Sequence, residues 1–179
     1  HKIKALLESN KIHFEGSDLN WKTSLRYLGV WLDPKLTFKS NIDQNVTKAK
    51  KAMAILYPLL KKNSKVNFKS KLTLYRSHIR PILTYACPVF DNSAKTHIKK
   101  LQLIQNKCLR MVLNAPYYTR IELLHETSNI PMINEFIEKL TFNFYKKSHI
   151  SKNALISRLG DYTRLSSTIR RKHKLPKRL

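Results

Sequence analysis

Apolar residues recur at alternating intervals of three and four along the middle of this chain, which is the periodicity of an amphipathic helix. Three such stretches predict three helices. The apolar positions of the first are Ile42, Val46, Ala49, Met53, Leu56 and Leu60; those of the second are Phe68, Leu72, Tyr75, Ile79, Ile82 and Ala86; those of the third are Ile98, Leu101, Gln105, Cys108 and Val112. Pro58 and Pro81 are expected to kink or end the first two helices. Helices of this length with short connections pack as an antiparallel bundle.

The segment before these helices predicts a small β unit. Residues Lys11–Phe14 can pair with Leu19–Ser24 through a turn at Glu15–Asp18, and Arg26–Leu32 supplies a third strand. Gly29 stands in the middle of that third strand, which is unusual because glycine weakens a strand. Asp33 and Pro34 then end it.

After Pro116 the pattern loosens into shorter helices, expected at Ile121–His125 and Ile133–Phe144. Residues 164–179 contain no carboxylate, and we expect this cationic tail to be disordered until it meets a polyanion. The predicted fold is mainly α. It consists of a small antiparallel β unit (1–33), a helical bundle (34–115), and a C-terminal helical region with a basic tail (116–179).

The charge balance points to a polyanionic partner. The chain has 35 Lys and Arg against 11 Asp and Glu, a formal net charge of +24. Such a surface repels itself unless a polyanion lies against it, and nucleic acid is the first candidate. No apolar run approaches the roughly 20 residues of a membrane span. Cys87 and Cys108 lack the partners of a zinc site, so we interpret them as buried free thiols in a reducing compartment.

The chain shows no pattern of catalytic residues. It has no paired carboxylates that would hold Mg²⁺, no glycine-rich phosphate loop, and no metalloprotease or nucleophile-elbow motif. Its seven histidines are scattered, and Asp33 and Asp91 are typical of cap and turn positions. We therefore expect no catalytic residue and no cofactor in this chain, which leaves binding as its function.

Candidate nucleic-acid contacts lie mainly on the second predicted helix. Lys69, Arg76 and Arg80 are spaced by seven and four and form one stripe with Thr73, which suits successive phosphates. The loop residues Lys61, Lys62 and Lys65 extend the positive field. A solvated helix face is the alternative interpretation. Lys48 and Lys51 lie elsewhere on the first helix and are interpreted as ordinary surface residues.

Two further segments are candidates for contact. Tyr117 and Tyr118, followed by Arg120, can stack on a base or ribose, although such a pair more often packs a loop against the bundle. The cationic tail contributes Arg170, Arg171 and Lys172.

Four segments in order resemble one family. They are RYLGVWLDPKLTF, KLTLYRSHIRPILTYACPVF, IKKLQLIQNKCLRMVLNAPYYTR and the ending HISKNALISRL…RRKHKLPKRL. The set is similar to the junction of palm and thumb, and the region after it, in the reverse transcriptases of jockey-type non-LTR retrotransposons. Because the sequence opens on His1 and its first methionine is Met53, we expect it to be part of a longer polypeptide.

The resemblance implies specific roles. Tyr27, Leu28, Gly29 and Val30 would belong to the primer grip, and the helices after Asp33 would form the thumb that holds an RNA–DNA hybrid. The catalytic aspartates and their Mg²⁺ would belong to the palm of the parent RNA-directed DNA polymerase. The implied partners are the RNA template, target DNA, and the remaining palm and fingers. Target-primed insertion implies a nuclear location, with the element's ribonucleoprotein also cytoplasmic.

Two other classes of protein stay open at this point. The chain can be a freestanding basic helical protein, such as a ribonucleoprotein scaffold or a chromatin factor. It can also be a helical module whose apolar seams bind a protein partner.

Overall fold

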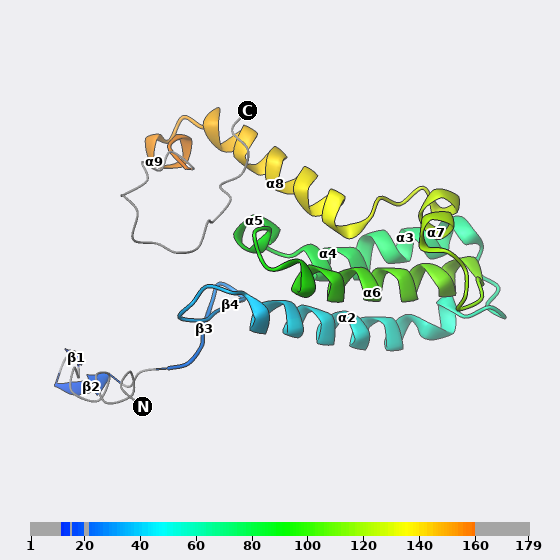
Figure 1. Cartoon of the computed structure of the whole chain (residues 1–179), viewed down its shortest axis with the longest axis horizontal. Helices are drawn as coiled ribbons and strands as arrows, with labels where there is room; N and C mark the ends of the chain where they lie inside the picture. Colours follow the sequence, from blue (N-terminus) through cyan, green and yellow to red (C-terminus); the bar gives the residue numbers. More distant parts are fainter. Residues whose placement is uncertain (1–11, 15, 20–21, 160–179) are drawn as a thin grey trace.

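The structure is a computed structural model that describes residues 12–14, 16–19 and 22–159 (Figure 1). Within these residues the chain is mainly helical, with small antiparallel strands at the N-terminal side and helices after them, which confirms the predicted fold class. Residues 160–179, which include Arg170, Arg171 and Lys172, lie outside the described residues. No helix in the described part is long and apolar enough to cross a membrane.

The β unit consists of two separate hairpins. Strand β1 (Ile12–Phe14) pairs with β2 (Ser17–Leu19), so Ser17 and Asp18 lie in a strand and not in the predicted turn. Strand β3 (Leu25–Tyr27) pairs with β4 (Val30–Leu32), with Tyr27 opposite Val30. The prediction of a single strand at Arg26–Leu32 is therefore wrong.

The reason for that error lies in the backbone at Leu28 and Gly29. Their φ angles are 45° and 83°, so both residues are in the left-handed region and form the two-residue turn of a tight hairpin. Glycine reaches such a φ at no steric cost, whereas leucine does not. The sequence signal is ambiguous because Leu28 looks like a strand residue.

The bundle begins with α2 (Lys39–Leu60) and ends with α6 (Lys95–Leu113); α3 (Phe68–Leu74), η1 (Tyr75–Ile79), α4 (Arg80–Thr84) and α5 (Cys87–Phe90) lie between them. The α3–α4 rod runs antiparallel to both α2 and α6, which pack on each other (Figure 1). The predicted seam of α2 is buried at Ile42, Ala49, Met53 and Leu60. Helix α2 continues through Pro58 and ends two residues later.

The second predicted helix is interrupted in two places. Residues Tyr75–Ile79 form a π turn, and Ala86 adopts a left-handed conformation with φ of 57°, which ends the helical path before Cys87. Pro81 explains the π turn, because it has no N–H for the carbonyl of Ser77 and its ring crowds that carbonyl. Widening the preceding turn relieves the conflict.

The C-terminal helices α7 (Ile121–Ser128), α8 (Ile133–His149) and α9 (Ala154–Ser157) follow, and α7 and α8 pack on α6. Their attachment is polar as well as apolar. The Nδ1–H of buried His125 donates to the carbonyl of Ile130 at 2.8 Å, and Gln102 Oε1 accepts from the Ile133 N–H at 2.8 Å. These bonds fix the turn between α7 and α8 against α6.

One hydrophobic core joins the bundle to α8. Among its fully buried members are Tyr75, Phe90, Leu101 and Ile133. Gln105 is also fully buried in the predicted seam of α6, and its amide N–H groups donate to Tyr75 Oη at 2.9 Å and to the Pro131 carbonyl at 3.0 Å. Cys87 and Cys108 are buried free thiols, as predicted.

Candidate nucleic-acid interface

Charge is distributed unevenly over the bundle. No carboxylate occurs from Gln44 to Phe90, a range that covers most of α2, the α2–α3 loop and the α3–α4 rod. The ten basic residues of this range are Lys48, Lys50, Lys51, Lys61, Lys62, Lys65, Lys69, Lys71, Arg76 and Arg80. Since these cations have no acidic neighbour along the chain, the field of this half of the bundle stays positive.

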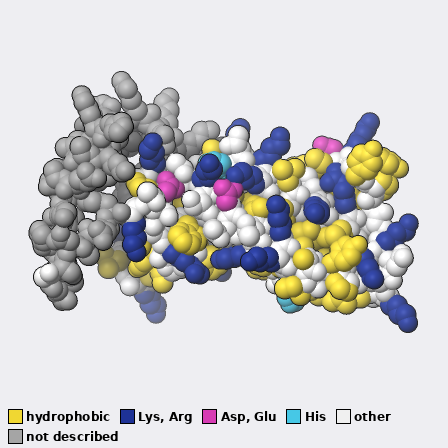
Figure 2. All heavy atoms as spheres, turned by 90° about the horizontal axis from the view of Figure 1, so that it is seen from below, with side chains coloured by type: hydrophobic (Ala, Val, Ile, Leu, Met, Phe, Trp, Pro, Cys, Tyr) yellow, Lys and Arg dark blue, Asp and Glu magenta, His cyan; other side chains and the backbone are white. Residues whose placement is uncertain are grey.

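The exposed face of α2 combines lysines with apolar side chains. Lys48, Lys51, Ile55 and Leu59 follow one another at intervals of three and four along α2, Lys62 comes two residues after the helix ends, and all five are exposed. Ile55 is 78% exposed although it is apolar. Figure 2 views the molecule from the α2 side and shows Lys and Arg interspersed with hydrophobic side chains along its length. We call these five residues the α2 outer face.

Sequence reasoning misses the α2 outer face, because it interprets Lys48 and Lys51 as ordinary surface residues. Two signals in the sequence point to this face: the missing carboxylates and the spacing of the lysines opposite the buried seam.

The α2–α3 loop presents Lys61, Lys62 and Lys65 to solvent, and Lys69 is exposed on the first turns of α3. Lys71 has a different role. It is only 3% exposed, and its ammonium donates to the Lys61 carbonyl at 2.8 Å, directly after the end of α2. A cation at a helix C-terminus satisfies a free carbonyl and interacts favourably with the helix dipole. Lys71 therefore holds the loop in place while its neighbours face outward.

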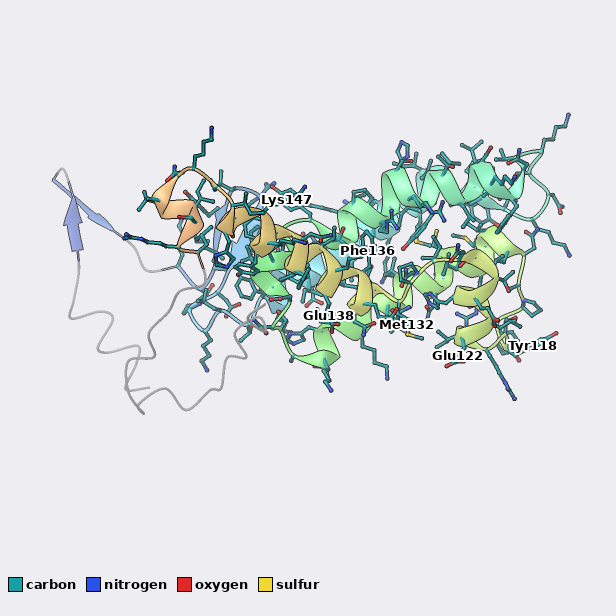
Figure 3. All side chains as sticks on the ribbon, turned by 90° about the horizontal axis from the view of Figure 1, so that it is seen from above. Tyr118, Glu122, Met132, Phe136, Glu138 and Lys147 are labelled. Carbon is teal, nitrogen blue, oxygen red and sulfur yellow. The ribbon has the colours of Figure 1, made fainter. Side chains whose placement is uncertain are left out.

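The stripe predicted on the second helix is broken at Arg80. In the π turn the Arg80 N–H donates to the Tyr75 carbonyl, five residues back instead of four, so the regular helical spacing between Arg76 and Arg80 is lost. Its guanidinium carbon lies 4.2 Å from the ring centroid of Phe136 on α8, the residue labelled in Figure 3. Partial burial, reinforced by the nearby Arg76, lowers the pKa of Arg80. Lys69, Thr73 and Arg76 stay exposed.

The β3–β4 hairpin is fastened to the bundle at its tip. The Tyr85 hydroxyl donates to the Leu28 carbonyl at 2.9 Å, and a Cβ added at Gly29 would lie 3.2 Å from Tyr85 Cε1. Glycine at position 29 thus allows the positive φ of the turn and leaves room for the Tyr85 ring. Around it, Tyr27 is 62% and Leu28 76% exposed, whereas Val30 is buried. Tyr85 is a positioning residue that sequence reasoning does not single out.

The base of the hairpin is held by Asp33 and Asn41. Asn41 Oδ1 accepts from the Trp31 N–H at 3.2 Å. The Asp33 carboxylate accepts hydrogen bonds from the N–H groups of Lys35, Thr37 and Phe38 and from the Thr37 hydroxyl. Burial alone would raise the pKa of Asp33, but these hydrogen bonds outweigh it, so the pKa lies below its ordinary value. Asp33 is thus a turn residue, as predicted; α2 itself has no side-chain cap.

The Tyr117–Tyr118 pair lies in the loop between α6 and α7. The exposed fractions of the two side chains are 87% and 75%, so they do not pack the loop against the bundle. Arg120, which directly precedes α7, is also exposed. Within residues 12–14, 16–19 and 22–159, no three His, Cys, Asp or Glu side chains form a group that could hold a metal ion.

Comparison with known proteins identifies the class that this chain resembles. The chain is similar to RNA-directed DNA polymerases of jockey-type non-LTR retrotransposons, which confirms the resemblance carried by the sequence motifs. No protein-family model matches the chain, and no solved structure matches it.

Three relatives, all from fruit flies, illustrate the match. The chain is 28% identical over 149 residues to the probable RNA-directed DNA polymerase from transposon X-element of Drosophila melanogaster. It is 28% identical over 156 residues to the RNA-directed DNA polymerase from mobile element jockey of Drosophila funebris. It is 28% identical over 148 residues to the probable RNA-directed DNA polymerase from transposon BS of Drosophila melanogaster. These matches cover 83%, 87% and 83% of this chain, but only 16%, 17% and 16% of the relatives.

Proposed function

We propose that this chain is the part of a non-LTR retrotransposon reverse transcriptase that holds the RNA template and the growing strand as a duplex. In this proposal the parent enzyme is an RNA-directed DNA polymerase whose catalytic aspartates and Mg²⁺ belong to other parts of the polypeptide. The bundle is the thumb, and Tyr27, Leu28, Gly29 and Val30 form the primer grip. The working enzyme acts in the nucleus on target DNA.

The observation that carries the proposal is the carboxylate-free half of the bundle with its α2 outer face. Helix α2 has 22 residues and is therefore about 33 Å long. A B-form duplex carries one phosphate charge per roughly 1.7 Å of axis, so on the order of 20 phosphates lie within that length. Lys48, Lys51 and Lys62 can reach phosphates while Ile55 and Leu59 lie over sugars.

This arrangement suits an RNA–DNA hybrid. The wide, shallow minor groove of an A-like duplex accepts a helix that touches sugars and phosphates without reading bases. None of the five residues of the α2 outer face is an Asn, Gln or Arg, the side chains that form paired hydrogen bonds with base edges. We therefore expect binding without sequence preference.

The first experiment compares four nucleic acids of equal length with the full chain by fluorescence anisotropy. They are an RNA–DNA hybrid, duplex DNA, single-stranded RNA and single-stranded DNA. The proposal predicts tightest binding to the hybrid. Equal affinity for all four would favour a generic basic nucleic-acid-binding protein instead, and no association with the hybrid at low salt would refute the proposal.

The second experiment locates the interface with two variants of equal net charge. The triple change Lys48→Gln, Lys51→Gln and Lys62→Gln removes the lysines of the α2 outer face. The control triple changes Lys139, Lys146 and Lys147 to glutamine; these residues are also exposed but lie on α8. Each lost phosphate contact lowers the slope of log affinity against log salt by about 0.9, so the first variant should lose about 2 to 3 from the slope. Equal slopes for the two variants would place the duplex elsewhere.

A further inference from the structure

The loop that carries Tyr117 and Tyr118 has a defined conformation. Asn114 ends α6 in a left-handed conformation, and the Ala115 N–H returns to the Arg110 carbonyl at 2.9 Å. The Thr119 N–H donates to the Pro116 carbonyl at 3.2 Å, and Arg110 Nη2 donates to the Thr119 carbonyl at 3.2 Å. The two tyrosines therefore project from a turn that hydrogen bonds brace on both sides.

Both aromatic rings are left open. Their centroids are 5.4 Å apart and their planes cross at 81°, so the edge of one ring meets a face of the other and the remaining faces are free. Aromatic side chains usually bury about 150–250 Å² each on folding. Tyr117 and Tyr118 are 87% and 75% exposed, so within the described part of the chain they gain almost none of the stabilisation that burial of an aromatic ring provides.

Several basic residues lie at the same end of the bundle as the pair. Arg120 follows it, and the loop with Lys61, Lys62 and Lys65 lies at the same end of the bundle, opposite the β3–β4 hairpin (Figure 1). Figure 3 shows Tyr118 and Glu122 projecting outward at that end. Glu122 and Glu126, the two carboxylates of α7, disfavour a phosphate directly at that helix and leave the lysine loop as the place for the backbone of a bound strand.

We propose that Tyr117 and Tyr118 stack on unpaired bases of single-stranded nucleic acid, with the lysine loop on its phosphates. Bases inside a duplex already stack on one another, so their faces are not available to a protein ring. A single strand offers every base face, and aromatic residues beside a cationic track are the usual means of binding it without sequence preference. This inference rests on the proposed function and adds a strand beyond the held duplex as the ligand.

The experiment uses the full chain and single-stranded RNA and DNA that contain 2-aminopurine, a base whose fluorescence falls on stacking. The double change Tyr117→Leu and Tyr118→Leu removes the rings and should weaken single-strand binding about tenfold or more, with the quenching lost. Tyr117→Phe with Tyr118→Phe keeps the rings and should bind as the unaltered chain does. Phe142→Leu, at an aromatic residue of α8 that is 45% exposed, is the control and should change nothing.

The affinity for an RNA–DNA hybrid is measured in parallel with every variant. The leucine variant should keep its hybrid affinity within about twofold. Unchanged single-strand affinity in that variant, an equal loss for hybrid and single strand, or a loss as large with phenylalanine would each overturn the stacking proposal. A chain that binds single strands through these rings but ignores the hybrid would refute the proposed function alone.

Discussion

Replacing Asp33 with alanine should destabilise the connection between the β3–β4 hairpin and α2. Helix α2 starts without a side-chain cap, since Phe38 precedes it in a left-handed conformation. Asp33 instead holds the turn that precedes the helix. Its Oδ1 accepts from the N–H groups of Lys35 and Thr37 at 3.1 Å each. Its Oδ2 accepts from the Phe38 N–H at 2.9 Å and from the Thr37 hydroxyl at 3.0 Å.

The size of the effect follows from these four bonds. A single hydrogen bond to a charged acceptor contributes about 1.5–3 kcal/mol to stability. Because water reaches this half-buried turn, we expect a loss of about 1.5 kcal/mol in the free energy of unfolding, and not the sum of four separate bonds. With a urea dependence of about 2 kcal/mol per molar, the unfolding midpoint should fall by about 0.7 M.

The pKa of Asp33 adds a pH dependence with a definite sign. Its pKa in the folded chain is below the value of 3.8 for the unfolded chain. The stability from its charge is therefore fully present above that value and is lost as the pH falls through the lower folded pKa. Asp33→Asn keeps one acceptor oxygen but carries no charge. The difference in free energy of unfolding between this variant and the unaltered chain should therefore become smaller in acid.

The assay is urea unfolding followed by circular dichroism at neutral and acidic pH. Asp43→Ala is the matched control, because Asp43 forms a partly exposed ion pair with Lys100, and such a pair is worth about 0.2–1 kcal/mol. Asp33 does not stabilise this turn beyond an ordinary ion pair if Asp33→Ala lowers the midpoint no more than Asp43→Ala does. The charge of Asp33 contributes nothing if the difference in midpoint between the unaltered chain and Asp33→Asn is independent of pH.

Three other changes test separate features of the fold. Gly29→Ala and Gly16→Ala both place alanine at a positive φ, but only Gly29 faces the Tyr85 ring, so its variant should lose more stability in urea unfolding, by about 1 kcal/mol or more. Tyr75→Phe removes the hydroxyl that accepts from Gln105 and should cost about 1 kcal/mol in the same measurement, whereas no loss would show that the bond contributes nothing. Burial raises the pKa of Cys108 to about 12, so its alkylation near a pH of about 8 should be slow until urea unfolds the chain.

The sequence predicted the first and third helices well because their apolar spacing reflects burial directly, whereas the second helix is interrupted at the π turn and at Ala86. The predicted apolar positions of the third helix lie within α6, and four of the six predicted for α2 (Ile42, Ala49, Met53 and Leu60) are buried; Val46 and Leu56 are half-buried. The resemblance to jockey-type polymerases was also readable, since it depends on the order of motifs and not on geometry.

Other features depend on contacts between distant segments, and spacing carries no information about those. The bond from Tyr85 to Leu28 joins residues 57 positions apart. Arg80 leaves its predicted stripe because Pro81 forces a π turn, and helical spacing assumes a uniform turn. Lys71 resembles its exposed neighbours in sequence, yet it is buried against the end of α2.

The double attachment of the β3–β4 hairpin has a mechanical consequence. Asp33 and Asn41 anchor its base beside α2, while Tyr85 anchors its tip at the end of the α3–α4 rod. A hairpin attached at one end only can rotate relative to the helices. The β3–β4 hairpin is attached at both ends and therefore moves together with α2 and the α3–α4 rod. Any tilt of the bundle is therefore transmitted to Leu28 and Gly29 without a hinge between them.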